Sequence, residues 1–244
     1  LCFLKEEVNY KRIEQQLTDP VIISQIEELK LKLETTVCST LPTAFWHRKK
    51  HVVILPYIKN FNERQIPTKS RPIQMNHELV EMCKKEINEL LKNWIISPSK
   101  SSWSCLTFYV NKNVELERGV PRLVINYKPL NKVLEWIRYP IPNKKDLIKR
   151  LSQTVIFSKF DLKSDFWQIQ IHPKYRYKSA FTTPIGHYEW NVMPFGLKNA
   201  PSEFQNIMND IFNQFSLFSL VYLDIFLIFS KSISEHWIHL SVFF

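Results

Sequence analysis

The chain has 244 residues, 45% hydrophobic and 23% charged, so it can bury a substantial core and is not a disordered segment. This length suits one large domain or two small ones. The formal net charge of +10 points to a polyanionic partner, nucleic acid before a membrane surface, although a merely basic cytosolic protein would carry the same charge.

Cysteine and glycine usage excludes several kinds of site. The cysteines show no CxxC or Cys/His ligand spacing, so we expect reduced thiols: Cys2, Cys38, Cys83 and Cys105. With three glycines for fourteen prolines, the chain carries neither a GxGxxG nor a Walker phosphate loop. No secretory signal is visible, and Leu1 in place of Met suggests a fragment of a longer chain.

Residues 1–40 are predicted to be a helical leader or linker. Asp19 can cap a helix whose first position is Pro20. Apolar residues then recur at helical spacing: Ile22, Ile26, Leu29 and Leu33. We expect a packing or linking role for this helix, without chemistry.

Residues 41–73 are expected to be irregular because four prolines interrupt them. The aromatic residues Phe45, Trp46 and Tyr57 lie among basic residues there. Such a mixture suits contact with a nucleic-acid backbone, and it suits an ordinary solvated surface equally well.

A helix is predicted from about Asn76 to Asn93, with one apolar stripe explained by core packing: Leu79, Cys83, Ile87, Leu90 and Trp94. After Pro98 and a serine-rich loop, two hairpin strands are expected at Cys105–Asn111 and Arg122–Tyr127. The charged residues Lys112–Arg118 would form the turn between them.

The next segments alternate between strands and helices. Pro140 and Pro142 indicate an extended connection, followed by a short helix at Lys144–Leu151 and a strand that ends at Asp161. Further strand material is predicted at Ser179–Thr183 and Tyr188–Val192. After a loop broken by Gly196 and Pro201, a helix beginning at Ser202 would pack under the next hairpin. The sequence therefore indicates an α+β fold with a mixed sheet.

Residues 215–229 contain one charged residue, Asp224, in an otherwise apolar and hydroxyl-bearing run. The run is too long for one strand, so we expect two buried strands joined by a tight turn at Asp224. A membrane span is the alternative, but a carboxylate in mid-span costs roughly 2.5–3.5 kcal/mol. We therefore expect no membrane association.

Asp161 and Asp224 each follow or interrupt a hydrophobic strand, far apart in the sequence. A carboxylate in apolar surroundings needs a partner. If the two strands are neighbours, the carboxylates could share a divalent cation, because hard cations prefer oxygen ligands. The spacing alone is a weak signal for such a site.

Four segments resemble the successive motifs of reverse transcriptases: RLVINYKPLN, FDLKSDFWQI, FTTPIGHYEWNVMPFGLKNAPSEFQ and VYLDIFLIFS. The resemblance is strongest to plant pararetroviruses of the caulimovirus group, including copies integrated in plant genomes, with gypsy-type retrotransposons next. It covers roughly residues 41–244, and several motifs in the right order make it specific.

The resemblance implies a right-hand polymerase fold with a mixed or antiparallel palm sheet backed by helices. The fingers would comprise roughly 41–153 and 170–198, and the palm roughly 154–169 and 199–244. The thumb would barely begin at Glu235–Phe244. The protease and RNase H regions of a parent polyprotein would be absent here.

The resemblance also implies the roles of individual residues. Asp161 and Asp224 would be the catalytic carboxylates that bind two Mg2+ ions, with Mn2+ as a substitute, and the backbone carbonyl of Leu162 would be a further metal ligand. Arg122 would clamp the incoming triphosphate, for which a guanidinium is suited. Tyr222 would touch the primer end.

The remaining implied contacts concern the nucleotide pocket. Phe166 would be the aromatic gate that excludes a 2′-hydroxyl, with simple core packing as the alternative. Phe195 and Gly196 would line the pocket, where glycine lets the backbone approach the substrate. Lys198 would contact phosphate or template, unless it is only a surface charge.

Two residues depart from the family pattern. The usual Tyr-x-Asp-Asp turn has Ile225 at its last position, and an isoleucine cannot coordinate a metal. Asp165 stands where a small residue is usual, and its charge would repel a triphosphate. Mutation of a residue that only hydrogen-bonds a metal ligand can lower metal affinity or activity by about 10- to 100-fold. The loss of a ligand itself should therefore impair catalysis at least as much.

The resemblance thus implies an RNA- and DNA-directed DNA polymerase that uses a primed RNA or DNA template and deoxynucleoside triphosphates. It would work inside the cell, in the cytoplasm, a viral particle or the nucleus. The alternative is a catalytically dead nucleic-acid-binding protein with a polymerase fold, from a decayed integrated element.

Overall fold

The computed structural model describes residues 11, 14–38, 51–67, 71–110, 121–141, 143, 147, 149–151, 154–162 and 165–244. The predicted turn at Lys112–Arg118, Pro142 and much of the predicted helix at Lys144–Leu151 lie outside these residues. The chain forms two compact units. The first unit comprises 1–41, 141–162 and 209–244, and the second comprises 42–140 and 163–208. The fingers and palm boundaries given above stay predictions.

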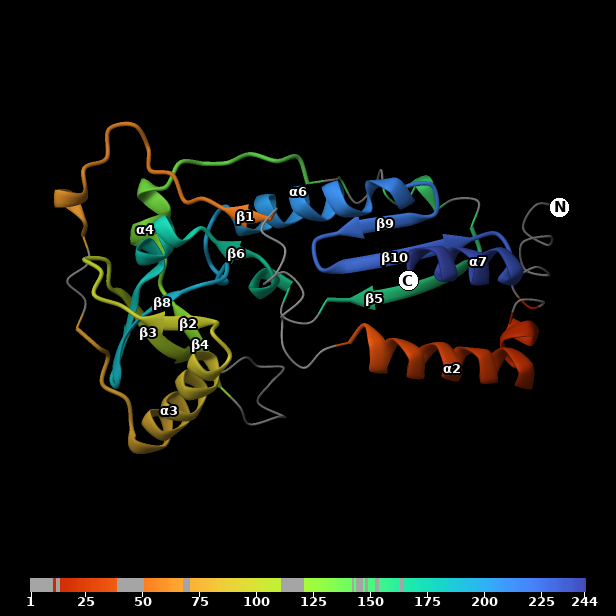
Figure 1. Cartoon of the computed structure of the whole chain (residues 1–244), viewed down its shortest axis with the longest axis horizontal. Helices are drawn as coiled ribbons and strands as arrows, with labels where there is room; N and C mark the ends of the chain where they lie inside the picture. Colours follow the sequence, from red (N-terminus) through yellow and green to blue (C-terminus); the bar gives the residue numbers. More distant parts are fainter. Residues whose placement is uncertain are drawn as a thin grey trace. The chain divides into compact units, whose positions relative to one another are not determined.

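The first unit is built on a three-stranded antiparallel sheet in the order β5-β10-β9 (Figure 1). Its strands are β5 (Ile156–Asp161), β9 (Ser219–Tyr222) and β10 (Ile225–Ser230). Its helices are α2 (Pro20–Thr36), the 3-10 helix η4 (Asn213–Phe215) and α7 (Ile233–Phe243). The prediction of two strands and a tight turn within 215–229 is confirmed.

Capping side chains explain where the helices of this unit begin. The Asp19 carboxylate accepts a hydrogen bond from the backbone of Val21, as the sequence predicts for the start of α2. Ser232 accepts from the Glu235 backbone, and the Glu235 carboxylate accepts in return from the backbone of Lys231. No residue of α2 is buried, whereas α7 buries His236 and Leu240.

Aromatic rings fill the core beside this sheet. The ring of Phe226 on β10 lies 4.6 Å from that of Phe212 and 5.9 Å from that of Phe243, centre to centre. Phe212 ends helix α6 (Ala200–Phe212), whose residues from Asn209 belong to the first unit. The predicted packing of this helix against the hairpin is therefore confirmed for its last turn.

The second unit contains a five-stranded mixed sheet in the order β2-β8-β7-β3-β4, in which only β3 and β7 are parallel. The strands are β2 (Ile96–Pro98), β3 (Cys105–Val110), β4 (Arg122–Ile125), β7 (Phe181–Thr183) and β8 (Gly186–Trp190). A separate parallel pair joins β1 (Val52–Val53) to β6 (Gln170–Ile171).

Helices α3 (His77–Lys92), α4 (Lys128–Val133) and the first part of α6 belong to the second unit. Three 3-10 helices complete it: η1 (Glu63–Gln65), η2 (Asp165–Gln168) and η3 (Pro173–Ser179). The largest fully buried side chains include Trp103, Tyr127, Phe181 and Phe204. The α+β class with a mixed sheet is confirmed.

Several predicted boundaries are wrong. Trp94 is not on the buried stripe of α3, because the helix ends at Lys92 and Trp94, with a φ of 56°, is 72% exposed. Strand β4 ends at Ile125, and the fully buried Tyr127 precedes α4. Helix α6 begins at Ala200, two residues before the predicted start.

Within the part of the chain that the structure describes, no helix has both the length and the apolar character needed to span a membrane.

Candidate functional site

The turn between β9 and β10 is a two-residue loop. Tyr222 and Ile225 pair across it, leaving Leu223 and Asp224 as the turn residues. Leu223 has a φ of 52°, a left-handed conformation that costs an L-residue roughly 1–2 kcal/mol. A positive φ at the first turn position matches the turns that follow the twist of a hairpin. The turn that carries Asp224 is therefore tight and locally strained.

Asp161 lies at the same end of the sheet as this turn. It is the last residue of β5, and its Cα partner on β10 is Ile225. The backbone N–H of Leu162 donates to the carbonyl of Asp224 over 2.8 Å. The structure thus brings together the two strand ends that carry Asp161 and Asp224, as expected if the two carboxylates act jointly.

Ile225 stands directly opposite Asp161 in the antiparallel register. Side chains in such a pair project from the same face of the sheet, with Cβ atoms about 4.5–5.5 Å apart. A carboxylate at position 225 would therefore be a close neighbour of Asp161. In this chain that neighbour is a hydrocarbon.

A charged neighbour of Asp161 is Lys159, two residues earlier on β5. The Lys159 Nζ lies 3.2 Å from an Asp161 carboxylate oxygen, and both side chains are more than half exposed. Solvent screens such a pair, so it holds Asp161 only weakly. Among the described residues no group of three or more His, Cys, Asp or Glu side chains could hold a metal ion. Two carboxylates at one sheet end still provide the hard oxygen ligands that Mg2+ requires.

Tyr222, the last residue of β9, is half-buried beside the turn. Its predicted contact with a primer end stays a prediction, as does coordination by the Leu162 carbonyl.

In the second unit, Phe166 belongs to an aromatic cluster. Its ring centre lies 5.1 Å from that of Phe195 and 5.3 Å from that of Phe204. Phe204 is fully buried, whereas Phe195 is 51% exposed. Phe166 therefore makes the core packing contacts expected for its alternative role, and its role as a gate stays a prediction.

Gly196 occupies a loop that requires a glycine. Its φ is +91°, and a Cβ there would meet no atom closer than 3.6 Å, so conformation rather than space selects the residue. The Asn131 side chain holds this loop, since it donates to the Gly196 carbonyl over 2.8 Å and accepts from the Lys198 backbone over 2.9 Å. Sequence reasoning missed Asn131, although it lies within one of the recognised motifs.

The two predicted cationic contacts lie in different surroundings. Lys198 donates its ammonium protons to the Leu134 carbonyl, and burial lowers the pKa of Lys198. Arg122 is exposed at the start of β4, opposite Val110. Asp165 is the first residue of η2, and its side chain lies outside the described part. The phosphate contacts of Arg122 and Lys198 stay predictions.

A family model described as "Reverse transcriptase (RNA-dependent DNA polymerase)" matches residues 110–244, more than half of the chain. The Genome polyprotein of Petunia vein clearing virus (isolate Shepherd) is 43% identical over 229 residues, which cover 91% of this chain and 10% of the polyprotein. The Enzymatic polyprotein of Cauliflower mosaic virus (strain Strasbourg) is 43% identical over 174 residues, which cover 71% of this chain and 26% of that polyprotein.

Solved structures share the fold. A Prototype Foamy Virus Protease-Reverse Transcriptase CSH mutant superposes with a TM-score of 0.71 and 20% identity, covering 97% of this chain and 31% of that one. A foamy viral protease-reverse transcriptase in complex with RNA/DNA hybrid has a TM-score of 0.60 and 24% identity, covering 71% and 23%.

These matches confirm the resemblance to pararetroviral polyproteins and the polymerase fold, while the chain spans only a small part of each polyprotein. The chain belongs to the reverse transcriptase family of nucleotidyltransferases.

Proposed function

We propose that this chain is the fingers and palm of a pararetroviral reverse transcriptase, in which Asp161 and Asp224 hold two Mg2+ ions and Ile225 impairs nucleotide addition. The observation that carries the proposal is the register of β5 and β10, which puts Asp161 beside the turn that contains Asp224 and opposite Ile225. Ions held by Asp161 and Asp224 would supply activation of the primer 3′-hydroxyl and neutralisation of the leaving pyrophosphate.

The protein's own residues would bind and orient the substrates. Asp161 and Asp224 would supply negative charge at the metal site, and Arg122 would bind the triphosphate. Phe166 would exclude a 2′-hydroxyl, next to a pocket wall formed by Phe195 and Gly196. Tyr222 would contact the primer end, and Lys198 would contact phosphate only if it released the Leu134 carbonyl.

The substrates would be deoxynucleoside triphosphates and a primed RNA or DNA template. Two observations support this proposal. The net charge of +10 suits a polyanion, and foamy viral neighbours of the same fold are described in complex with RNA/DNA hybrid and with double-stranded DNA.

A second candidate is a nucleic-acid-binding protein that has lost catalysis. Ile225 favours it, because the cross-strand position opposite Asp161 is occupied by a side chain that cannot bind a metal. Asp165 adds a negative charge near the expected triphosphate. Binding without chemistry would still show the steep salt dependence of phosphate contacts.

Primer extension on poly-rA/oligo-dT, with Mg2+ or Mn2+, tests the two candidates. The parent should extend weakly, and Ile225→Asp should increase extension by at least about 10- to 100-fold. Ile225→Asn is the matched control, because it has the same shape as the aspartate without its charge, and it should not recover activity. Asp224→Asn should abolish the activity that Ile225→Asp restores.

Three outcomes separate the candidates. Equal extension by the parent and by Asp224→Asn would show that the site is assigned wrongly. Salt-dependent binding of primer-template without extension by Ile225→Asp would favour the second candidate. Recovery only when Asp165→Gly is added would identify Asp165 as a further block.

A further inference from the structure

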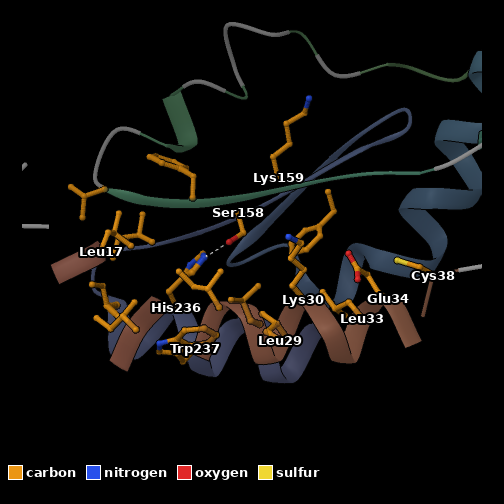
Figure 2. Close-up of a pocket in the computed structure, with 18 residues that line it drawn as sticks. Leu17, Leu29, Lys30, Leu33, Glu34, Cys38, Ser158, Lys159, His236 and Trp237 are labelled. Carbon is orange, nitrogen blue, oxygen red and sulfur yellow. Dashed lines mark hydrogen bonds between the residues drawn. The ribbon is translucent and has the colours of Figure 1, made fainter. Parts of the chain in front are cut away.

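A buried histidine on α7 joins the two strands that carry the site. The Nε2 atom of His236 lies 2.8 Å from the Ser158 hydroxyl on β5, and its Nδ1 atom lies 2.8 Å from the Ser230 hydroxyl on β10. Figure 2 shows the first of these bonds. Ser230 also lies 2.7 Å from the Nδ1 atom of His239. His236 is only 6% exposed.

The network can be satisfied by a neutral His236 in either tautomer, and one arrangement runs from Ser158 to His239. The Ser158 hydroxyl donates to His236 Nε2, the His236 Nδ1–H donates to Ser230, and the Ser230 hydroxyl donates to His239 Nδ1. This arrangement needs a neutral imidazole, and burial and the neighbouring His239 both lower the pKa of His236. A fully satisfied buried network of this kind favours a single packing arrangement.

The two serines occupy different positions along their strands. Ser158 pairs with Ile228, and Ser230 pairs with Ile156, so the hydroxyls lie diagonally across the β5–β10 pair on one face. Ser158 is three residues before Asp161, and Ser230 is five residues after Ile225. A single imidazole thus contacts both strands, three residues from the Asp161 end of β5 and at the end of β10 that lies away from Ile225.

Side-chain bonds of this kind matter for β5 because it is an edge strand. Within the described residues, its sheet partner is β10 alone. Residues of β5, α2 and α7 line a groove of about 680 Å3, and Ser158, His236 and Trp237 are among them (Figure 2). Since α2 buries no residue, the helix that secures β5 against β10 is α7.

A change of register would break these bonds and displace Asp161 together with them. A slip of one residue would turn Ser158 to the opposite face of the sheet. A slip of two would move it by about 6.8 Å, beyond the reach of the imidazole. Either slip would separate Asp161 from its place opposite Ile225.

We propose that His236 is a positioning residue that fixes the register of β5 against β10 and thereby the spacing of the Asp161 and Asp224 carboxylates. Its effect on metal binding rests on the proposed function of those carboxylates. Its effect on the strand pair does not.

The test compares His236→Phe with His239→Phe. His236→Phe keeps a ring but loses both hydrogen bonds. His239→Phe keeps the ring that stacks on Phe218, with centres 4.2 Å apart, and loses a nitrogen that does not bridge the strands. Hydrogen exchange should become at least about tenfold faster across 156–162 and 225–230 in His236→Phe, and should stay near the parent's rate in His239→Phe.

A conservative variant adds a rescue. The amide of a glutamine reaches the position of Nε2, so His236→Gln should keep the Ser158 bond and recover protection on β5. Unchanged exchange at 161–162 in His236→Phe would overturn the proposal. Equally faster hydrogen exchange in His236→Phe and His239→Phe would overturn it as well. Any disturbance of α7 packing would then be enough to loosen the strands, without a specific role for His236.

Mn2+ affinity, measured in the Ile225→Asp background, separates this proposal from the proposed function. We expect an affinity loss of about tenfold in His236→Phe and little change in His239→Phe. Mn2+ binding that is lost in Asp161→Asn but unchanged in His236→Phe would refute the positioning role. Absence of Mn2+ binding in every variant would refute the metal site, while the exchange data would still decide whether His236 fixes the strand register.

Discussion

The loop around Gly196 in the second unit and the Tyr222–Ile225 turn in the first are held in different ways. Side chains fasten the loop: Asn131 bonds the Gly196 carbonyl, and Asn199 bonds the Glu135 carbonyl and the Ile137 backbone. The turn is held by strand pairing and by the backbone bond from Leu162 to Asp224.

This difference shows which changes the scaffold tolerates. In the loop, the side chains that determine the backbone are also part of the recognised motif, so a substitution there would damage the fold. At the turn the backbone supplies its own bonds, and residue 225 can change from a carboxylate to a hydrocarbon without loss of the hairpin. The hairpin therefore forms with a hydrocarbon at position 225.

The largest loss of stability should follow from removing a buried ring from the core near the Gly196 loop. Phe204→Ala removes a fully buried ring that packs against Phe166, and should lower the free energy of unfolding by about 3–5 kcal/mol. Thermal unfolding measures the loss, and hydrogen exchange should show it around 166–199.

Phe226→Ala is the matched change in the first unit, where Phe226 is 3% exposed. It should loosen β5, β9 and β10 and leave the Gly196 loop protected. If each substitution loosened both regions equally, the two units would not respond separately and the comparison would fail.

The next effect concerns Lys178 in the second unit. Its ammonium donates to the Leu55 carbonyl over 2.6 Å and lies 3.2 Å from the centre of the Tyr57 ring. Burial lowers the pKa of Lys178 from 10.5 to about 8. The unfolded chain therefore holds this proton more tightly, so stability should rise from pH 8 towards 10.5, by about 3 kcal/mol in all.

Lys178→Met should remove that rise. Burial raises the pKa of Tyr57 above 10.0, which lowers stability at still higher pH, so the parent and the variant are compared as a difference. Melting temperatures at several values between pH 7.5 and 10 measure it. If the melting temperatures of the parent and Lys178→Met changed with pH in parallel, the predicted lowering of the Lys178 pKa would be wrong.

Local patterns predicted much of this structure. The Asp19 cap and Pro20 predicted the start of α2, and the helical spacing of apolar residues placed each end of α3 to within a residue, because those signals act over a few positions. The order of the five-stranded sheet was not predictable in this way, since Cys105 of β3 pairs with Phe181 of β7.

The same difference between local patterns and long-range packing applies to the candidate site. The hydrophobic strand pattern pointed to Asp161 and Asp224, and motif resemblance agreed with it and flagged Ile225 as a departure. It could not show that Ile225 faces Asp161, that Asn131 reaches Gly196 across 65 positions, or that His236 reaches Ser158 across 78. Those facts depend on strand register and tertiary packing, which a single sequence specifies only through the whole fold.

A smaller effect should follow from Asn131→Ala. The loss of one bond to the Gly196 carbonyl and one from the Lys198 backbone should cost about 1–3 kcal/mol, since both backbone groups would need new partners. Hydrogen exchange at 195–199 and thermal unfolding measure the change. Asn131→Asp is the comparison, because it keeps the acceptor for Lys198 but sets a carboxylate oxygen against the Gly196 carbonyl. A loss in Asn131→Asp at least as large as in Asn131→Ala would assign the main effect to the Gly196 bond, whereas a much smaller loss would assign it to the Lys198 bond.

The smallest change in stability should come from Ile225→Asp in the absence of divalent metal. It is also the most direct test of the turn. Two carboxylates directly opposite on β5 and β10 repel each other, so the free energy of unfolding should fall by about 0.2–1 kcal/mol. If position 225 completes a metal site with Asp161 and Asp224, Mg2+ should reverse this loss, by about 1.4 kcal/mol at ten times its Kd. Ile225→Asn should show neither the repulsion nor the gain. Equal stabilisation of the parent and Ile225→Asp by Mg2+ would mean that two carboxylates suffice to hold the ion, and the proposed impairment by Ile225 would then be wrong.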